Sequence, residues 1–362
     1  MRASHLDREG PDNPFPGRQS LERRLGHALP HQLGSNEGLD MPHRALSEAL
    51  GAPVAELARA YGDAQAFELR QQLAEQLGTP HDTLLVDAGA DSLIALTLRA
   101  LCDTGTTVIT SAGTYPTFRY FSEGHGCRLV EMTYQQAPGR LAPDVDALVQ
   151  AAWLHHARLV YLANPDNPSG HCLTRADIAY LVDNLPPMCH LLLDEAYHEF
   201  RPDQGDSTPM RGVVRLRTFS KAHGLAGLRI GYAIAAPEVL EVMSKVRIHY
   251  AVSSVAQAAA AVVLTHIDEV ERHVQSVIER REQLATQLQA WGAEVLPSAT
   301  NFVAIRMPGA EAALKTQQAL LADGVIIHRP PHPALGDILR ISAIDDALVS
   351  GRLSALQNAL QR

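Results

Sequence analysis

Residues 217–232 read RTFSKAHGLAGLRIGY, and the rest of the sequence is interpreted around this stretch. It begins as an apolar run with β propensity, breaks into a glycine-punctuated turn around Lys221, and resumes as a second strand-like run. A lysine between two buried runs is costly, and burial lowers the pKa of its amine, which makes the amine nucleophilic near neutral pH. Ser220 adds a hydroxyl, and Arg229 adds a planar cation that suits phosphate. The stretch therefore predicts a reactive amine beside a phosphate site.

Composition and charge limit the classes of protein to which this chain can belong. It has 362 residues, 46% hydrophobic and 20% charged, which allows one large domain and a smaller one. The net charge of −9 argues against nucleic acid or anionic membrane as the main partner. No apolar run approaches the roughly 18 residues of a membrane span, and the charged residues 1–10 predict no secretory signal. We therefore expect a cytoplasmic protein with no nucleic-acid or membrane partner.

The sequence offers no metal site. Four cysteines are scattered without a CxxC pair, which is typical of reduced thiols rather than of a disulfide framework or a zinc site. The pair His155-His156 has no third ligand at a suitable spacing and is interpreted as a solvated helix end.

Strand-like and helix-like segments alternate along the middle of the chain. Strands are expected at 84–86, 108–110, 129–134, 159–163, 190–193, 212–218 and 230–235, with helices at 93–101, 144–153, 174–184 and 237–245. This alternation predicts an α/β fold with a mostly parallel sheet sandwiched by helices. Ligands of such sheets bind at the carboxyl ends of the strands.

Three parts of the chain are expected to differ in organisation. Residues 1–33, rich in proline, glycine and charge, predict an N-terminal arm, and residues 34–255 a large domain. Residues 256–362 predict a smaller α+β domain, with long helices over 255–291, strands at 301–306, 325–328 and 340–342, and helices at 310–322 and 346–360.

Polar residues follow several of the expected strands. The small-residue turn 87–92 after strand 84–86 opens a helix, and the unpaired N–H groups at the start of that helix could bind an anion, although most such turns bind nothing. Asn167 follows strand 159–163 in a proline-rich turn, and its amide can donate to a ligand oxygen. Tyr115 follows another strand, and its ring could stack on a flat cofactor.

Asp194 ends a run of three leucines, so its carboxylate is expected to be buried. A buried carboxylate needs a cationic partner or strong hydrogen bonds. A protonated pyridine nitrogen would serve, and protonation would make the pyridine ring an electron sink. The alternative is an aspartate that caps the following turn. Together with Lys221, this residue predicts a pyridoxal phosphate site.

Taken together, these motifs resemble those of fold-type-I pyridoxal phosphate enzymes of the class I and II aminotransferase family. Within that family they are most similar to the histidinol-phosphate aminotransferases. The resemblance extends over nearly the whole chain and includes the segments Ser35-Asn36-Glu37, Ala60-Tyr61-Gly62-Asp63, Gly324-Val325-Ile326-Ile327 and Leu339-Arg340-Ile341-Ser342.

The resemblance implies roles for the residues around the cofactor. Lys221 would hold the cofactor as a Schiff base and move the proton of the donor. Asp194 would pair with the pyridine nitrogen, and Asn167 and Tyr197 would hydrogen-bond the phenolic oxygen. Tyr115 would stack on the ring.

The resemblance also implies a phosphate site that two subunits share. The phosphate would be held by the backbone of Ala90 and Asp91 with Ser220 and Arg229. Tyr61 of the neighbouring subunit would reach the same phosphate, so a homodimer is expected.

Substrate recognition is implied at a second set of residues. Arg340, with Asn36, would bind an anionic end of the substrate. The family usually has an arginine at the position of His328, and here Arg329 follows it, so either the arginine has slipped and still reaches inward or a histidine replaces it. Phe15 stands near the position of a family tyrosine and lacks its hydroxyl.

The implied reaction is ping-pong amino transfer between an amino donor and a 2-oxo acid. L-Histidinol phosphate is the leading donor and 2-oxoglutarate the acceptor. The alternatives are aromatic or other amino acids as donors, or a decarboxylase or oxidative deaminase on the same fold. A binding protein that kept the fold without catalysis would have no need of Lys221.

Overall fold

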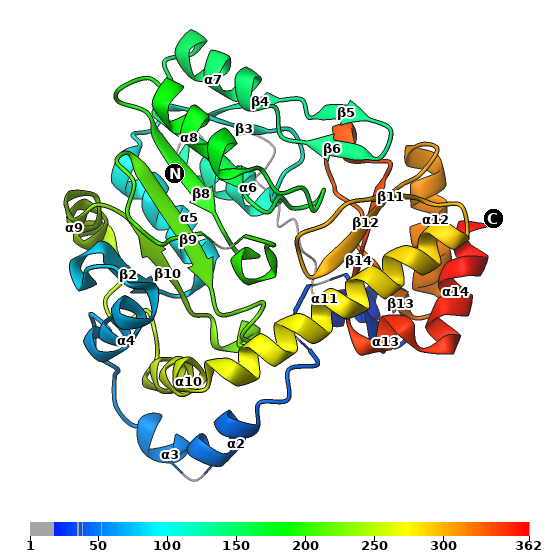
Figure 1. Cartoon of the computed structure of the whole chain (residues 1–362), viewed down its shortest axis with the longest axis horizontal. Coiled ribbons are helices and arrows are strands. Elements are labelled where there is room, and N and C mark those ends of the chain that lie inside the picture. Colours follow the sequence, from blue (N-terminus) through cyan, green and yellow to red (C-terminus); the bar gives the residue numbers. More distant parts are fainter. Residues whose placement is uncertain (1–17, 35, 38, 52, 204, 362) are drawn as a thin grey trace.

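A seven-stranded sheet forms the centre of the molecule in the computed structural model, which describes residues 18–34, 36–37, 39–51, 53–203 and 205–361 (Figure 1). In spatial order its strands are β2 (Leu84–Asp87), β10 (Gly231–Ile234), β9 (Val213–Thr218), β8 (His190–Asp194), β7 (Leu159–Ala163), β3 (Thr107–Ser111) and β4 (Arg128–Met132). Six of these strands run in one direction, and β10 runs in the opposite direction, antiparallel to its neighbours β2 and β9. The predicted mostly parallel sheet is therefore confirmed.

Apolar residues on both faces of the strands explain why the sheet is covered by helices on both sides. In β7 every residue is buried, and successive side chains point to opposite faces. Leu159 and Tyr161 lie in the core shared with α5 (Gly89–Leu101), whereas Val160 and Leu162 lie in the core shared with α7 (Val145–Leu154). Continuous apolar runs of this kind are typical of buried parallel strands.

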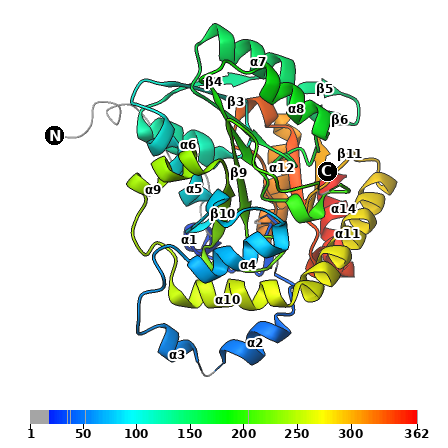
Figure 2. The ribbon, with the colours of Figure 1, turned by 60° about the vertical axis from the view of Figure 1, so that its left-hand side comes forward.

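The remaining helices of this part complete the two layers (Figure 2). The layer of α5 also contains α6 (Pro116–His125) and α9 (Pro237–Val246), and the layer of α7 contains α8 (Arg175–Asn184). Helices α4 (Phe67–Leu77) and α10 (Ser254–Thr265) pack near β2 and β10. The shorter helices are α1 (Arg18–Leu25), α2 (Arg44–Leu50) and α3 (Val54–Leu57).

The C-terminal part has a sheet and a core of its own. The long helix α11 (Ile267–Ala290) leads to an antiparallel sheet in the order β11 (Glu294–Leu296), β12 (Phe302–Arg306) and β14 (Ile338–Ser342). Helices α12 (Ala310–Ala322), α13 (Asp345–Leu348) and α14 (Ser350–Leu360) pack on this sheet. The boundaries expected at residues 33/34 and 255/256 stay a prediction.

Two small pairs of strands complete the fold. Strand β1 (His31–Gln32) pairs in parallel with β13 (Val325–Ile326), so a segment near the start of the chain joins the C-terminal part. Strands β5 (Gln135–Ala137) and β6 (Arg140–Ala142) form a hairpin.

Most expected elements are present, with a few differences. Thr174 caps α8 through a reciprocal capping box with Asp177, as its position before the helix predicted. Helix α6 and the β5–β6 hairpin were not predicted. The expected closing helix is split into α13 and α14 because Val349 has an extended backbone. None of the helices in the described part of the chain is long and apolar enough to cross a bilayer.

Candidate functional site

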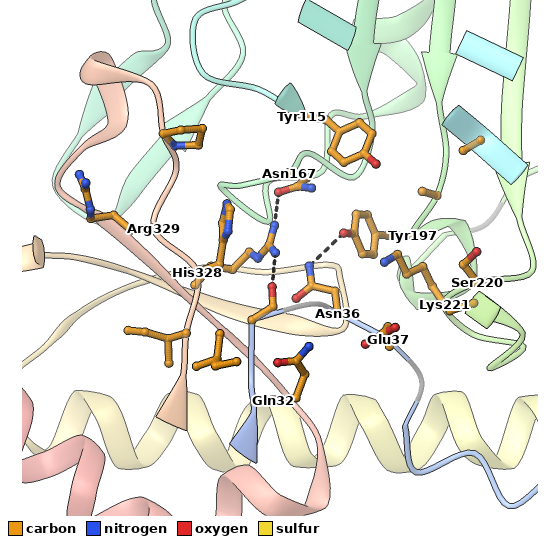
Figure 3. A pocket seen from close by; sticks show the side chains of 18 of the residues that line it. Gln32, Asn36, Glu37, Tyr115, Asn167, Tyr197, Ser220, Lys221, His328 and Arg329 are labelled. Carbon is orange, nitrogen blue, oxygen red and sulfur yellow. Dashed lines mark hydrogen bonds between the residues drawn. The ribbon is translucent and has the colours of Figure 1, made fainter. Parts of the chain in front are cut away.

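The carboxyl ends of parallel strands meet at one edge of the sheet, and a cavity of about 710 Å³ opens there (Figure 3). The turns after β2, β3, β7, β8 and β9 all contribute to its wall. Of the residues predicted for the site, the cavity is lined by Asn36, Ala90, Asp91, Tyr115, Asn167, Asp194, Tyr197, Ser220, Lys221, Arg229, His328, Arg329 and Arg340. The structure thus brings together residues from both the central sheet and the C-terminal part.

Lys221 lies in the tight turn that follows β9. The Gly224 N–H donates to the Lys221 carbonyl at 3.1 Å. Gly224 has a positive φ of 64°, and a Cβ there would lie 2.6 Å from Met41 Cβ, so the turn requires glycine. Burial, followed by the charge of Arg340, lowers the pKa of the Lys221 amine to about 8. The amine therefore loses its proton much more readily than an exposed lysine does.

Asp194 is buried at the end of β8 beneath the cavity. Its carboxylate accepts hydrogen bonds from the Tyr161 hydroxyl at 2.7 Å and from the Ala196 N–H at 3.0 Å. Burial raises the pKa of Asp194 to about 6, and no basic side chain of the described residues forms an ion pair with it. A cation in the cavity would stabilise this carboxylate, so the residue fits a protonated pyridine nitrogen.

The start of α5 forms a cradle for an anion. The N-cap residue of this 13-residue helix, Ala88, makes no side-chain cap bond, and Ala90 and Asp91 in its first turn line the cavity, so the first N–H groups are suited to bind an anion there. Gly89 has a φ of 86°, and a Cβ there would lie 3.1 Å from Arg229 Nη2. Arg229 Nη2 lies 3.3 Å from Asp91 Oδ2. Helix dipole, guanidinium and the nearby Ser220 hydroxyl together suit a phosphate group.

Tyr115 lies above the cavity in Figure 3, as expected for a residue that follows β3. Its hydroxyl donates to Asp91 Oδ1 at 2.8 Å, which fixes one end of the ring. The face of the ring stays on the cavity wall, where a flat group could lie against it.

Arg340 joins the sheet edge to the N-terminal segment. Its guanidinium donates to Asn167 Oδ1 at 2.5 Å and to the Gly34 carbonyl at 2.7 Å. The amide of Asn36 is hydrogen-bonded to the Tyr197 hydroxyl at 3.0 Å and to Ser342 Oγ at 2.7 Å. These bonds hold a buried cation at the cavity wall in a fixed orientation.

His328 and Arg329 both line the cavity, on the side opposite Lys221 (Figure 3). The backbones of His328 and Arg340 pair through hydrogen bonds of 3.0 and 2.8 Å. Burial and the two neighbouring arginines hold the pKa of His328 well below its usual range, so its imidazole is uncharged at pH 7. Arg329 Nη1 donates to the Gly336 carbonyl at 3.3 Å, which turns part of its guanidinium away from the centre.

A buried ion cluster supports the turn that holds Asp194 and Tyr197. Glu195 is paired with Arg215 and Arg217 at 3.0 Å and with Arg201 at 3.6 Å. Burial alone would raise the pKa of Glu195, but the arginines lower it to about 2. This pairing explains how the sequence tolerates Arg217 inside the buried strand β9.

Sequence reasoning missed Tyr161 and the cavity residues Gln32 and Gln317. Tyr161 carries the hydroxyl that donates to Asp194. The sequence offered one indication of this role, because Tyr161 is the only residue with a polar group in the otherwise aliphatic strand β7. Gln32 and Gln317 come from β1 and α12, and no local pattern places them at the cavity.

Among the described residues predicted for the site, Tyr61 alone does not line this cavity. Tyr61 is 84% exposed and stacks on Tyr250, with ring centroids 4.8 Å apart. Phe15 lies outside the described residues. Among the described residues no group of side chains could hold a metal ion, and all four cysteines are free.

Comparison with known proteins places this site in a family. The family model for aminotransferase class I and II matches residues 31–356. The chain is 37% identical to a histidinol-phosphate aminotransferase of Anaeromyxobacter sp. (strain Fw109-5), with 85% of each chain covered. It is 34% identical to an aromatic amino acid aminotransferase of Corynebacterium glutamicum (strain R), with 90% of this chain and 93% of the relative covered.

A solved structure is similar over almost the full length. The histidinol-phosphate aminotransferase of Sinorhizobium meliloti, in complex with pyridoxal-5'-phosphate, superposes with a TM-score of 0.90 at 34% identity. The alignment covers 96% of this chain and 95% of that one. With a family match over most of its length, this chain belongs to the class I and II aminotransferases.

Proposed function

We propose that this aminotransferase holds pyridoxal phosphate in the cavity and moves an amino group from an L-amino donor to 2-oxoglutarate in a ping-pong sequence. The observation that carries the proposal is the pairing of two oppositely perturbed groups, Lys221 and Asp194, in one cavity with an anion cradle. The bound cofactor in the similar Sinorhizobium meliloti structure supports it. When bound, the cofactor supplies an electron sink for a carbanion at the donor Cα.

Five side chains of the cavity have assigned roles in this proposal. The amine of Lys221 has a pKa of about 8. It would remove the proton from the donor Cα and deliver it to the carbon of the cofactor that carries the amino group. Asp194 would pair with the ring nitrogen and favour its protonated form, and Tyr197 and Asn167 would hydrogen-bond the phenolic oxygen. Arg340 binds an anionic end of the substrate, which fixes the Cα proton within reach of Lys221.

The phosphate of the cofactor is held at the amino end of α5. The N–H groups of Ala90 and Asp91 donate to it, together with the Ser220 hydroxyl and the guanidinium of Arg229. Because Asp91 already binds Arg229, that guanidinium is oriented before the anion arrives.

L-Histidinol phosphate is the leading donor. Its support comes from the names of relatives such as the Anaeromyxobacter enzyme. A donor phosphate would need a cation, and Arg24 and Arg329 both line the cavity.

An aromatic amino acid is the second candidate. The observation that favours it is the uncharged imidazole of His328 on the cavity wall, which cannot neutralise a phosphate. The Corynebacterium relative carries the corresponding name.

A panel of donors offered to the holoenzyme with 2-oxoglutarate tests both proposals, with glutamate, carbon dioxide and peroxide as readouts. We expect glutamate, with the highest kcat/KM for histidinol phosphate. In His328→Arg the added cation should raise the preference for phosphorylated over unphosphorylated donors by about tenfold. Glutamate formed only from unphosphorylated donors would reject histidinol phosphate. Carbon dioxide or peroxide without glutamate would reject amino transfer.

The homodimer is supported by the position of Tyr61. Its exposed ring cannot serve its own cavity, which it does not line, so it is available to a second subunit. Mixing Lys221→Ala with Tyr61→Ala subunits would form hybrid dimers in which one site keeps both residues. We expect activity to return on mixing, whereas no recovery would argue against a shared site.

The cytoplasmic location stays a prediction, which cell fractionation would check.

A further inference from the structure

Strand β1 presents one glutamine to the cavity. Gln32 is opposite Ile326 in the parallel pair of β1 and β13, and the Leu33 N–H donates to the Ile326 carbonyl at 2.8 Å. Because side chains alternate along a strand, His31 points to Asp346, with a 2.7 Å contact, and Leu33 points into the core of the C-terminal part. Gln32 is left facing the cavity, below Asn36 in Figure 3.

The amide oxygen of this side chain lacks a hydrogen-bond donor. Gln32 Oε1 is buried and has no partner in the part of the chain that the structure describes. A buried acceptor without a donor loses its hydration and gains nothing in return, so such groups are rare in native proteins. The oxygen is therefore suited to accept a hydrogen bond from a ligand.

The surroundings of Gln32 indicate the kind of ligand group that would donate. The lining of the cavity includes the aliphatic residues Leu21, Leu321 and Ile326, and Ile326 is the strand partner of Gln32. A buried acceptor without a donor beside an apolar side chain suits a flat, uncharged ring that carries an N–H or O–H group at its edge. A second glutamine, Gln317, also lines the cavity, but its amide nitrogen is bonded to the Ile327 carbonyl at 3.3 Å, and its oxygen is not among the buried atoms that lack a partner.

We propose that Gln32 determines the choice of donor, because its Oε1 accepts a hydrogen bond from the N–H or O–H at the edge of the donor's ring. The inference depends on the proposed aminotransferase function and deepens it. The favoured substrate class is amino donors with an imidazole N–H or a phenol O–H. Donors with a plain phenyl ring leave the oxygen of Gln32 unpaired and are disfavoured.

Tyrosine and phenylalanine form the matched pair of donors for the test, because they differ by one hydroxyl. In the wild-type holoenzyme we expect kcat/KM for tyrosine to exceed that for phenylalanine by about tenfold or more. In Gln32→Met, which keeps the length of the side chain and removes the acceptor, the ratio should fall close to one, mainly through loss of activity with tyrosine. Gln317→Met is the matched control and should keep the wild-type ratio.

A binding measurement separates this inference from the proposed function. Calorimetry with the unreactive 3-(4-hydroxyphenyl)propionate and 3-phenylpropionate should show the same tenfold preference in the wild type and its loss in Gln32→Met. An unchanged ratio in Gln32→Met, or an equal loss in Gln317→Met, would overturn the role of Gln32. If no donor is turned over, the proposed function fails, and the binding ratio still decides the role of Gln32.

Discussion

The two sides of the cavity are built in different ways. The side around Lys221 comes from turns that directly follow neighbouring strands of one sheet, and Asp194, Tyr197 and Ser220 are all nearly fully buried there. The side around His328 is assembled from the N-terminal segment and from β13 and β14, which lie near the other end of the sequence. Under the proposed function, the sheet supplies the residues for the chemistry, whereas segments at its margin determine the choice of donor.

The largest effect should come from the sheet side. Lys221→Ala removes the amine that moves the Cα proton, so we expect kcat to fall by a factor of about 10⁴ or more. Steady-state kinetics with saturating cofactor would measure this loss. The control is Lys245→Ala on α9, whose amine is exposed and paired with Glu241, and it should leave kcat unchanged. Full activity in Lys221→Ala would show that the lysine is misassigned.

A smaller effect is expected at Arg340, where the two sides meet. Arg340→Met removes the cation that binds the anionic end of the substrate, and kcat/KM should fall by roughly a hundredfold, mainly through KM. The absorbance of the bound cofactor should stay close to that of the wild type. If Arg340→Met weakened the binding of the cofactor and left KM for the donor unchanged, Arg340 would belong to the cofactor site and not to the substrate site.

A third effect concerns the stability of the protein, and it depends on pH. In the cofactor-free fold the pKa of Lys221 is about 8, against 10.5 for an ordinary lysine. Between these values the unfolded chain binds the extra proton, so the free energy of unfolding rises with pH across this window. Below pH 8 the buried amine is charged in both states, and its burial costs about 3 kcal/mol.

Replacing that amine should therefore stabilise the cofactor-free protein. Lys221→Met is expected to unfold at higher urea than the wild type at pH 7, and the difference should shrink as the pH rises from 8 to 10.5. A difference that stays constant over this range would show that the lysine is not buried in its charged form.

The two sides of the cavity also differ in how well their residues could be predicted from the sequence. The limits of β7 and the place of Lys221 follow from local patterns, because a buried parallel strand is a continuous apolar run and its site residues come next in the chain. Helix α6 was missed because its residues, PTFRYFSEGH, include aromatic, β-branched and glycine residues of weak helix propensity, although its apolar and polar side chains do separate onto two faces.

Residues on the other side of the cavity depend on contacts that no local pattern contains. Gln32 faces the cavity only because β1 pairs with β13, which lies near the other end of the chain. The same holds for the contact of Asn36 with Tyr197, which was not predicted, although the family resemblance implied that both residues belong to the site. The roles of Tyr61 and Phe15 need a second subunit or residues beyond those described, so they stay predictions.

The long-range bonds of the N-terminal segment have a consequence for how the protein is made. His31 binds Asp346, and Asn36 binds Ser342, so partners in the finished protein are separated by more than 300 residues of chain. Synthesis runs from the amino end, so this segment leaves the ribosome early and waits until β14 has followed it. A nascent chain stopped before β14 would contain every strand of the central sheet and still lack Arg340. Under the proposed role of Arg340, the protein would become able to bind its substrate only near the end of translation.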